Sequence, residues 1–347
     1  MAESFVLTLF LLCPCLGAFG MWLFFVKYQL HRTPRHRGVL LLAGNGLVFL
    51  TLLSLPLPMG EIYFRWFYDT TDSFSLTKTT QRWFERHYRK NDAGVRDSVE
   101  RYTLEKLSDR RRLVILGDSF TAAQGVADVE RRFANRMRTL LPDWEIRVHA
   151  RGGWDTPDEL EEVTQMARSG YQADAVLLVY CLNDIAAVIP EWQPILKSIY
   201  AKDKDGFWVA HSYLLNTIYY RLYASSHPQV GNYFEFVLDA YAGLPWLKER
   251  ELLEQIQEVV ANQMHAKFLV ATFPFLNSLE KYYRFQPAHD RLDGYWKARG
   301  IPHLDLLSVF AASRSADVMV NRFDAHPNER AHEMAAEAIA KFVRANL

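Results

Sequence analysis

The stretch LVILGDSFTAAQGV, Leu113–Val126, decides how the rest of the chain is interpreted. Four apolar residues run into a Gly-Asp-Ser turn, and a helix-like pattern follows the turn. A serine that directly follows a buried strand is either part of an ordinary polar turn or a nucleophile. The residues at the ends of the other predicted strands separate these two interpretations.

The chain after residue 110 alternates between two hydrophobic patterns. Apolar runs typical of buried strands occupy residues 112–117, 144–150, 175–182, 267–273 and 301–307. Patterns typical of helices occupy residues 129–141, 157–168, 247–265, 290–299 and 328–345. This alternation predicts an α/β fold in which helices cover both faces of a parallel sheet. Such sheets bind ligands at the carboxyl ends of their strands.

Candidate catalytic residues follow these strands. A serine becomes a nucleophile when a base takes its proton and a third group orients that base. Ser119 is the candidate nucleophile, and a loop before the last helix offers His326 as base and Asp324 as the orienting group. The oxyanion then needs fixed hydrogen-bond donors. The amide of Gly153, in the Gly-Gly pair after the second strand, and the side chain of Asn183 are the candidate donors.

Each of these patterns also has an ordinary interpretation. Gly-Asp-Ser after a strand is often only a turn, Asn-Asp often caps a helix, and Asp-x-His occurs in surface loops and metal sites. His332 is a second candidate base. It lies six residues beyond His326, more than one helical turn along the last helix. We therefore expect His332 to pack or cap rather than to reach Ser119.

Taken together, the four blocks resemble the SGNH (GDSL-type) hydrolase family. LGDSFTAAQGV resembles its first block, GGWDT its second, YCLND its third and DAHPN its last, and NDAGVRD resembles a lead-in segment of bacterial members. The resemblance covers about residues 90–345. It implies a three-layer, flavodoxin-like fold, a triad of Ser119, Asp324 and His326, and an oxyanion hole formed by Ser119, Gly153 and Asn183. It requires no cofactor and no metal.

The chain departs from the family pattern in three places. Cys181 stands where the third block usually has a glycine, and only Ala325 separates Asp324 from His326. No asparagine precedes the glycine of the second block, where Val148 and His149 stand instead.

The first sixty residues have a different composition. Residues 5–26 and 38–60 carry no charge, and each run is long enough to span a bilayer as a helix. The segment between them carries Lys27, Arg32, Arg35 and Arg37. Basic residues in a short loop indicate the cytoplasmic side, so the rest of the chain is expected outside the cytoplasm. The aromatic residues of 62–69 fit either an interfacial belt or core packing.

These patterns divide the chain into three parts. Residues 1–60 form the expected transmembrane hairpin, 61–110 a linker with the lead-in segment, and 111–347 the catalytic domain. An aromatic-rich insertion at about residues 185–246 is either a lid or core for inserted helices.

The overall composition excludes several classes of protein. Lys and Arg, 40 in total, balance 40 Asp and Glu, so there is no basic field for nucleic acid. The three cysteines, Cys13, Cys15 and Cys181, allow no disulfide framework or zinc motif.

The resemblance implies a bacterial serine esterase, and the two apolar spans with their basic loop predict that it is anchored by two passes in the inner (cell) membrane, with its catalytic domain on the periplasmic or extracytoplasmic side. Its expected substrate is an acyl or acetyl ester of a lipid or cell-envelope glycan. Two alternatives remain: a polysaccharide O-acetyltransferase with the same triad, and a non-catalytic membrane-anchored binding module. No protein partner is indicated.

Overall fold

Five parallel strands form the central sheet, in the order β2-β1-β3-β4-β5. Their bounds are β1 Arg111–Gly117, β2 Trp144–Ala150, β3 Ala175–Cys181, β4 Lys267–Phe273 and β5 His303–Asp305. The three long central strands are apolar and buried along nearly their whole length, as expected for a sheet covered on both faces. This confirms the predicted parallel sheet, and its strand order is the flavodoxin-like one.

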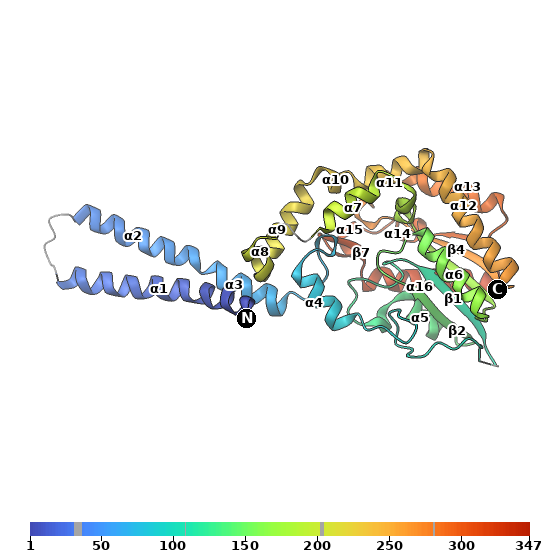
Figure 1. The fold of residues 1–347 in the computed structure, drawn as a ribbon, viewed down its shortest axis with the longest axis horizontal. Coiled ribbons are helices and arrows are strands. Elements are labelled where there is room, and N and C mark those ends of the chain that lie inside the picture. Colours follow the sequence, from blue (N-terminus) through green and yellow to red (C-terminus); the bar gives the residue numbers. More distant parts are fainter. Residues whose placement is uncertain (31–36, 108, 202–204, 280–281) are drawn as a thin grey trace.

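Helices cover both faces of this sheet (Figure 1). Right-handed crossovers place α5 (Phe133–Leu140) on one face and α6 (Thr156–Ser169), α12 (Pro245–Glu258) and α13 (Gln286–Ala298) on the other. The closing helix α16 (Glu329–Asn346) packs on α5, while α6 packs on α12. The predicted three-layer arrangement is therefore confirmed.

Turns, rather than a helix, follow the Gly-Asp-Ser sequence. Residues 118–127, which we call the nucleophile loop after the predicted nucleophile Ser119, precede a short 3-10 helix, η3 (Val129–Arg131). Ala123 and Gly125 have φ values of +59° and +88°, which a right-handed helix excludes. The helix-like pattern after Ser119 is thus not realised.

The last motif also differs from its predicted form. Asp324 and His326 were expected in a loop, but they lie on a short strand, β7 (Asp324–Pro327), which pairs antiparallel with β6 (Met319–Asn321). Asn328 stabilises this pair because its Nδ2 donates to the Met319 carbonyl while its Oδ1 caps α16.

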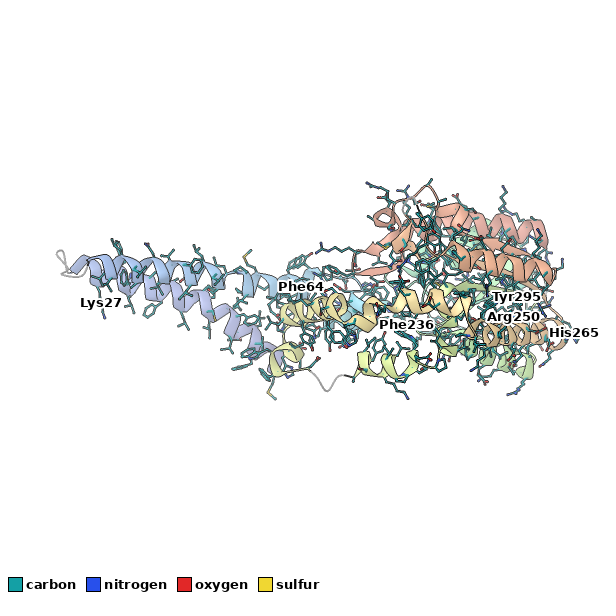
Figure 2. The ribbon with its side chains drawn as sticks, turned by 90° about the horizontal axis from the view of Figure 1, so that it is seen from above. Lys27, Phe64, Phe236, Arg250, His265 and Tyr295 are labelled. Carbon is teal, nitrogen blue, oxygen red and sulfur yellow. The ribbon has the colours of Figure 1, made fainter. Side chains whose placement is uncertain are left out.

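The insertion folds into helices. They are η4 (Leu182–Val188), α7 (Trp192–Tyr200), α8 (Phe207–His211), α9 (Tyr213–Ser226), α10 (Pro228–Gly231) and α11 (Tyr233–Ala242). Trp192 is buried and packs its ring 4.7 Å from that of Tyr233, and α11 packs against α12 and α13. Phe236 lies on α11 (Figure 2). This part of the insertion is therefore core.

The N-terminal segment forms a helical hairpin that projects from the globular part (Figures 1 and 2). The hairpin contains α1 (Ala2–Leu30), α2 (Arg37–Ser54) and α3 (Pro56–Ile62), followed by the π-helical η1 (Tyr63–Phe67). A β-carbon on Gly17 would lie 2.4 Å from Thr51 Oγ1, so a small residue allows α1 and α2 to approach closely.

The computed structural model describes residues 1–30, 37–107, 109–201, 205–279 and 282–347. Arg32 and Arg35 of the predicted cytoplasmic loop lie outside the described residues. Two described helical stretches, residues 2–27 and 38–67, are long and apolar enough to cross a membrane. Only 6% of each apolar window is buried, so their side chains are covered by little protein.

Glu61 joins the hairpin to the insertion. Its buried carboxylate accepts hydrogen bonds from Ser212 Oγ at 2.7 Å and from the Leu214 amide at 2.9 Å, at the first turn of α9. Arg65 Nη2 donates to the same carboxylate at 2.5 Å. The hairpin base is therefore tied to α9 by buried polar contacts.

The neck, residues 63–77, leads from the hairpin to α4 (Lys78–His87). Of its aromatic residues, Tyr63, Trp66 and Phe67 are exposed, which favours the interfacial belt over core packing for these three. Further along the neck, the Ser73 amide donates to the Phe323 carbonyl at 3.1 Å. The neck therefore lies against the chain that leads into β7.

Candidate active site

Ser119, His326 and Asp324 form one chain of hydrogen-bonding contacts. His326 Nε2 lies 2.8 Å from Ser119 Oγ, and His326 Nδ1 contacts Asp324 Oδ1. The backbone amide of His326 also donates to Asp324 Oδ1, at 3.0 Å. The structure thus brings together the three residues that the sequence suggested for the triad.

The single residue between Asp324 and His326 is explained by β7. Alternate side chains of a strand point to the same face, so residues two apart lie side by side. Asp324 and His326 are such a pair on β7, with Ala325 between them. The one-residue spacing therefore suits a strand, whereas it looked irregular for a loop.

The charges of this pair stabilise each other. Burial alone would lower the pKa of His326, but the neighbouring Asp324 carboxylate outweighs burial and, with Asp118, raises this pKa above its usual 6.5. Burial would raise the pKa of Asp324, but the charge and hydrogen bonds of His326 lower it below its usual 3.8. The arrangement suits an ionised aspartate that supports an imidazolium.

Asp118 braces the turn that carries Ser119. Its Oδ1 accepts from the Phe120 amide at 2.8 Å, and its Oδ2 accepts from Asn183 Nδ2 at 3.3 Å. Ser119 Oγ lies 3.4 Å from the same Oδ2, so Asn183 and Ser119 are neighbours through Asp118. Burial raises the pKa of Asp118, an effect that the Phe120 amide and His326 offset only in part.

The Gly152-Gly153 turn lies beside the serine. A β-carbon on Gly152 would lie 4.0 Å from Ser119 Cβ and 3.3 Å from Gln124 Oε1. Gly153 has a φ of +82°, and a β-carbon there would meet no heavy atom of the described chain within 4 Å. Sequence reasoning selected Gly153 as the donor and passed over Gly152, although the Gly-Gly pair pointed to both residues.

Two further neighbours of the triad were missed from sequence. The first is Phe120, whose ring packs 5.3 Å from the His326 ring. The second is Gln124, whose amide donates to the Ser119 carbonyl and whose Nε2 donates to Ser75 Oγ of the neck at 2.8 Å. Phe120 was visible in the first block as the residue after the serine. The approach of Ser75 had no sequence signal, because the neck is more than forty residues away in the chain.

The remaining positions of the third and last blocks are structural. The Cys181 amide donates to Asp184 Oδ2 at 2.7 Å, so Asp184 holds the end of β3 where other members have a glycine. His332 is buried, its ring stacks on Phe133, and burial with nearby arginines lowers its pKa to about 3. His332 is therefore a neutral packing residue.

The described residues contain no group of three or more His, Cys, Asp or Glu side chains arranged to hold a metal ion. The contacts of the site are those of serine, histidine and carboxylate chemistry. They suit nucleophilic attack by a hydroxyl that passes its proton to an imidazole.

Comparison with known proteins gives a family match and several similar solved structures. Residues 115–334 match the GDSL-like Lipase/Acylhydrolase family. Similar solved structures include a lipolytic protein of the G-D-S-L family from Veillonella parvula, at 12% identity and a TM-score of 0.43, covering 68% of this chain and all of that one. Phospholipase A1 from Streptomyces albidoflavus has 12% identity and a TM-score of 0.43, with 69% and 100% covered. A lipase/acylhydrolase from Enterococcus faecalis has 15% identity and a TM-score of 0.40, with 68% and 97% covered.

These structural likenesses are weak, and no protein with a curated description matches the chain in sequence. The family match carries the assignment, because it spans more than half of the chain and includes Ser119, Asn183 and His326. The chain therefore belongs to the GDSL-like lipase/acylhydrolase family of SGNH hydrolases and is a serine hydrolase that acts on ester bonds.

Proposed function

We propose that this protein is a membrane-anchored esterase in which Ser119 is the nucleophile, His326 the base and Asp324 the group that orients the base. The observation that carries the proposal is the continuous contact from Asp324 through both nitrogens of His326 to Ser119 Oγ. Each member is placed for its step before any substrate binds.

The proposed reaction proceeds through an acyl-enzyme. Ser119 Oγ attacks the ester carbonyl carbon while His326 Nε2 takes the serine proton. The tetrahedral intermediate then expels the alcohol, which receives that proton from His326. Water attacks the acyl-enzyme and gives a proton to the same nitrogen, and the carboxylic acid leaves as Ser119 is re-protonated.

The oxyanion hole in this proposal is formed by the amides of Ser119 and Gly153 and the side chain of Asn183. Asn183 lies at the end of β3, and its contact with Asp118 holds it beside Ser119. One Nδ2 hydrogen faces Asp118, which leaves the other for the substrate oxygen. Donors fixed in advance stabilise the developing negative charge without reorganisation.

The proposed location is the bacterial inner (cell) membrane, crossed twice, with the catalytic domain on the extracytoplasmic side. Two apolar helices whose side chains are mostly exposed support this location. Exposed apolar surface of this extent is unfavourable in water, and a lipid bilayer would cover it. In this proposal residues 1–60 form the anchor, 61–110 the linker and 111–347 the catalytic domain. The substrate is an acyl or acetyl ester of a lipid or cell-envelope glycan that reaches this membrane surface.

A transferase would use the same residues and differ only in what attacks the acyl-enzyme. A non-catalytic binding module would lack a reason to hold Asp324, His326 and Ser119 in contact. Product analysis with and without an oligosaccharide acceptor separates hydrolysis from transfer.

Labelling with a fluorophosphonate tests the proposal without knowledge of the substrate. The wild type should be labelled, and Ser119→Ala and His326→Ala should lose labelling almost completely because triad members act as a unit. Asp324→Ala should retain more labelling than His326→Ala. His87→Ala is the matched control, since His87 also pairs with an aspartate: its Nε2 lies 2.8 Å from Asp69 Oδ2.

A folded wild type that remains unlabelled would show that the serine is not activated. Labelling that persists in Ser119→Ala would place the nucleophile elsewhere. Labelling lost in folded His332→Ala but kept in His326→Ala would overturn the assignment of the base.

A further inference from the structure

Arg96, in the segment NDAGVRD (Asn91–Asp97), is buried beneath the nucleophile loop, with 1% of its surface exposed. Its Nη1 donates to the carbonyls of Ala122 at 3.3 Å and Ala123 at 2.7 Å. Its Nη2 donates to those of Val126 at 2.7 Å and Ala127 at 3.0 Å. The remaining donor, Nε, reaches the His87 carbonyl at 3.2 Å. All five N–H groups of the guanidinium are thus used on backbone carbonyls.

The nucleophile loop needs such a partner. It consists of turns, and the left-handed conformations of Ala123 and Gly125 turn several carbonyls away from any strand or helix. Buried carbonyls without a donor cost free energy, so these groups must be satisfied from another segment. Arg96 supplies four of the required hydrogen bonds with a single planar group.

The loop transmits this anchoring to the serine over a short path. The Ala122 amide donates to the Asp118 carbonyl at 2.9 Å, and the Gln124 amide donates to the Ser119 carbonyl at 3.1 Å. The Ala123 carbonyl and the Gln124 amide belong to one peptide unit, so Arg96 holds the unit that donates to Ser119. Through the Ala122 carbonyl it also holds the unit next to the one that donates to Asp118.

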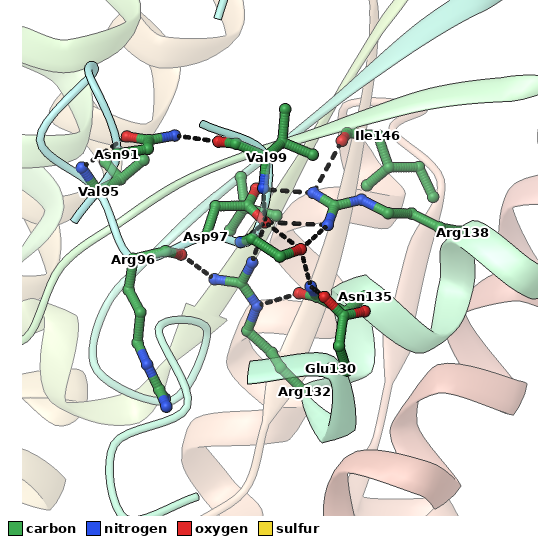
Figure 3. Close-up of polar contacts among 12 residues, drawn as sticks. Asn91, Val95, Arg96, Asp97, Val99, Glu130, Arg132, Asn135, Arg138 and Ile146 are labelled. Carbon is green, nitrogen blue, oxygen red and sulfur yellow. Dashed lines mark hydrogen bonds and ion pairs between the residues drawn. The ribbon is translucent and has the colours of Figure 1, made fainter. Parts of the chain in front are cut away.

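Arg96 is itself held from the opposite side (Figure 3). Arg132 Nη1 donates to the Arg96 carbonyl at 2.6 Å, and Arg132 and Arg138 both pair with Asp97, at 3.3 Å and 2.6 Å. Figure 3 shows that the Arg96 side chain extends away from this cluster. The segment is thus fixed to α5 by its backbone and by Asp97, and to the nucleophile loop by the Arg96 guanidinium.

We propose that Arg96 is a positioning residue for catalysis, which keeps Ser119 Oγ within hydrogen-bond distance of His326 Nε2 by fixing the nucleophile loop. The proposal rests on the proposed role of Ser119 as nucleophile. Arg96 touches neither the reacting atoms nor His326. Its loss displaces the serine and leaves the base unchanged, and displacements of about 1 Å at a reacting atom lower rates by about 100-fold.

Arg112 provides a matched control. It is equally buried and also donates to backbone carbonyls, those of Thr103 at 2.8 Å and Leu104 at 3.0 Å among them. It lies at the start of β1, whereas Ser119 follows the end of that strand. Substitution of either arginine removes a buried guanidinium from carbonyls, but only Arg96 supports the nucleophile loop.

The experiment compares Arg96→Lys and Arg96→Ala with Arg112→Lys and Arg112→Ala in the full-length chain. All four should lower the thermal midpoint. Per folded molecule, only the Arg96 variants should slow fluorophosphonate labelling, by about 10- to 100-fold. The pH midpoint of labelling should stay that of the wild type. Millimolar guanidinium should restore part of the rate in Arg96→Ala and none in Arg112→Ala.

Arg96→Lys is the milder variant that decides the matter if Arg96→Ala does not fold, because it keeps a buried cation at this position but cannot make all five hydrogen bonds. Unchanged labelling of folded Arg96→Lys, or an equal loss in the Arg112 variants, would overturn the positioning role. Failure of the proposed function would appear separately, as an unlabelled wild type or a labelled Ser119→Ala.

Discussion

At the scale of single residues, the proposed triad depends on two side chains that share one face of a short strand. The one-residue spacing of Asp324 and His326 looked like a departure from the family pattern, yet on β7 it places both side chains together. The same short spacing lets Asp324 contact both the ring and the backbone amide of His326. One oxygen of Asp324 thus holds both the ring and the backbone of His326.

The raised pKa of His326 predicts the pH dependence of catalysis. The base must be neutral to accept the serine proton, so labelling of Ser119 should fall as the pH decreases, with a midpoint above 6.5. Asp324→Asn removes the carboxylate that raises this pKa, so the midpoint should move down while the maximal rate falls. A wild-type midpoint below 6.5 would contradict the pairing of His326 with Asp324.

The raised pKa of His326 also makes stability depend on pH, in the opposite direction to catalysis. Folding raises the pKa of His326, so protonated His326, paired with ionised Asp324, stabilises the fold. This contribution is fully present below pH 6.5, the usual pKa of histidine. This contribution is lost as the pH rises through the folded pKa. The conditions that favour the fold at this residue are therefore those that disfavour catalysis.

Asn183→Ala tests the oxyanion hole. The substitution should lower kcat by about 100- to 1000-fold, the typical loss for one donor, with little change in KM. Hydrolysis of a simple aryl acetate across a range of concentrations provides both constants. An effect confined to KM would make Asn183 a substrate-binding residue.

At the scale of elements, the predicted strands were located well because long apolar runs are a strong local signal. β2 and β4 have the predicted bounds. The β6–β7 pair and the turns of the nucleophile loop were not predicted, because their conformations depend on distant segments. β7 exists only through its pairing with β6, and the nucleophile loop depends on Arg96, more than twenty residues upstream. On α11, Tyr233 and Phe236 pack on Trp192 while Phe234 packs on Phe275, so neighbouring aromatic residues all find partners and the helical period is not clear from the sequence.

Gly117 at the end of β1 provides an element-scale prediction. A β-carbon there would lie 2.9 Å from the Val179 carbonyl oxygen on β3 and 2.4 Å from Thr121 Oγ1. Gly117→Ala should therefore destabilise the fold by about 1–3 kcal/mol and slow labelling of Ser119, which lies two residues beyond. Urea unfolding and labelling rates measure the two effects.

Gly294 on α13 is the control for this substitution. A β-carbon there meets no atom within 4 Å in the described part of the chain. Gly294→Ala should leave labelling unchanged and stabilise the helix by up to about 1 kcal/mol. If Gly117→Ala and Gly294→Ala changed the free energy of unfolding and the labelling rate equally, the predicted clash at Gly117 would be wrong.

At the scale of the whole molecule, the hairpin is joined to the catalytic domain by structure rather than by a flexible linker. Glu61 holds the first turn of α9, and the neck runs along the catalytic domain as far as Phe323. Figure 1 shows both ends of the hairpin at this junction, with the C-terminus at the far end of the globular part. The sequence indicated the hairpin through its composition, but it carried no signal for these contacts.

The proposed topology is tested with reporters in a bacterial host. Alkaline phosphatase fused after Leu347 should be active, because basic residues between the two apolar helices predict that the catalytic domain lies outside the cytoplasm. The same reporter fused after Arg37 should be inactive. The reverse pattern, with both fusions expressed, would invert the orientation.

The contact between the neck and the segment Asn321–Phe323, which leads into β7, limits how the enzyme can be released from its anchor. Asn321 Nδ2 donates to the Thr71 carbonyl at 2.9 Å, and the Ser73 amide donates to the Phe323 carbonyl. A protease that cuts on the hairpin side of Tyr68 leaves these contacts on the shed fragment, whereas a cut after Leu76 removes them. Secretion by proteolytic shedding would therefore preserve the support of the triad only when cleavage falls at the bilayer-proximal end of the neck.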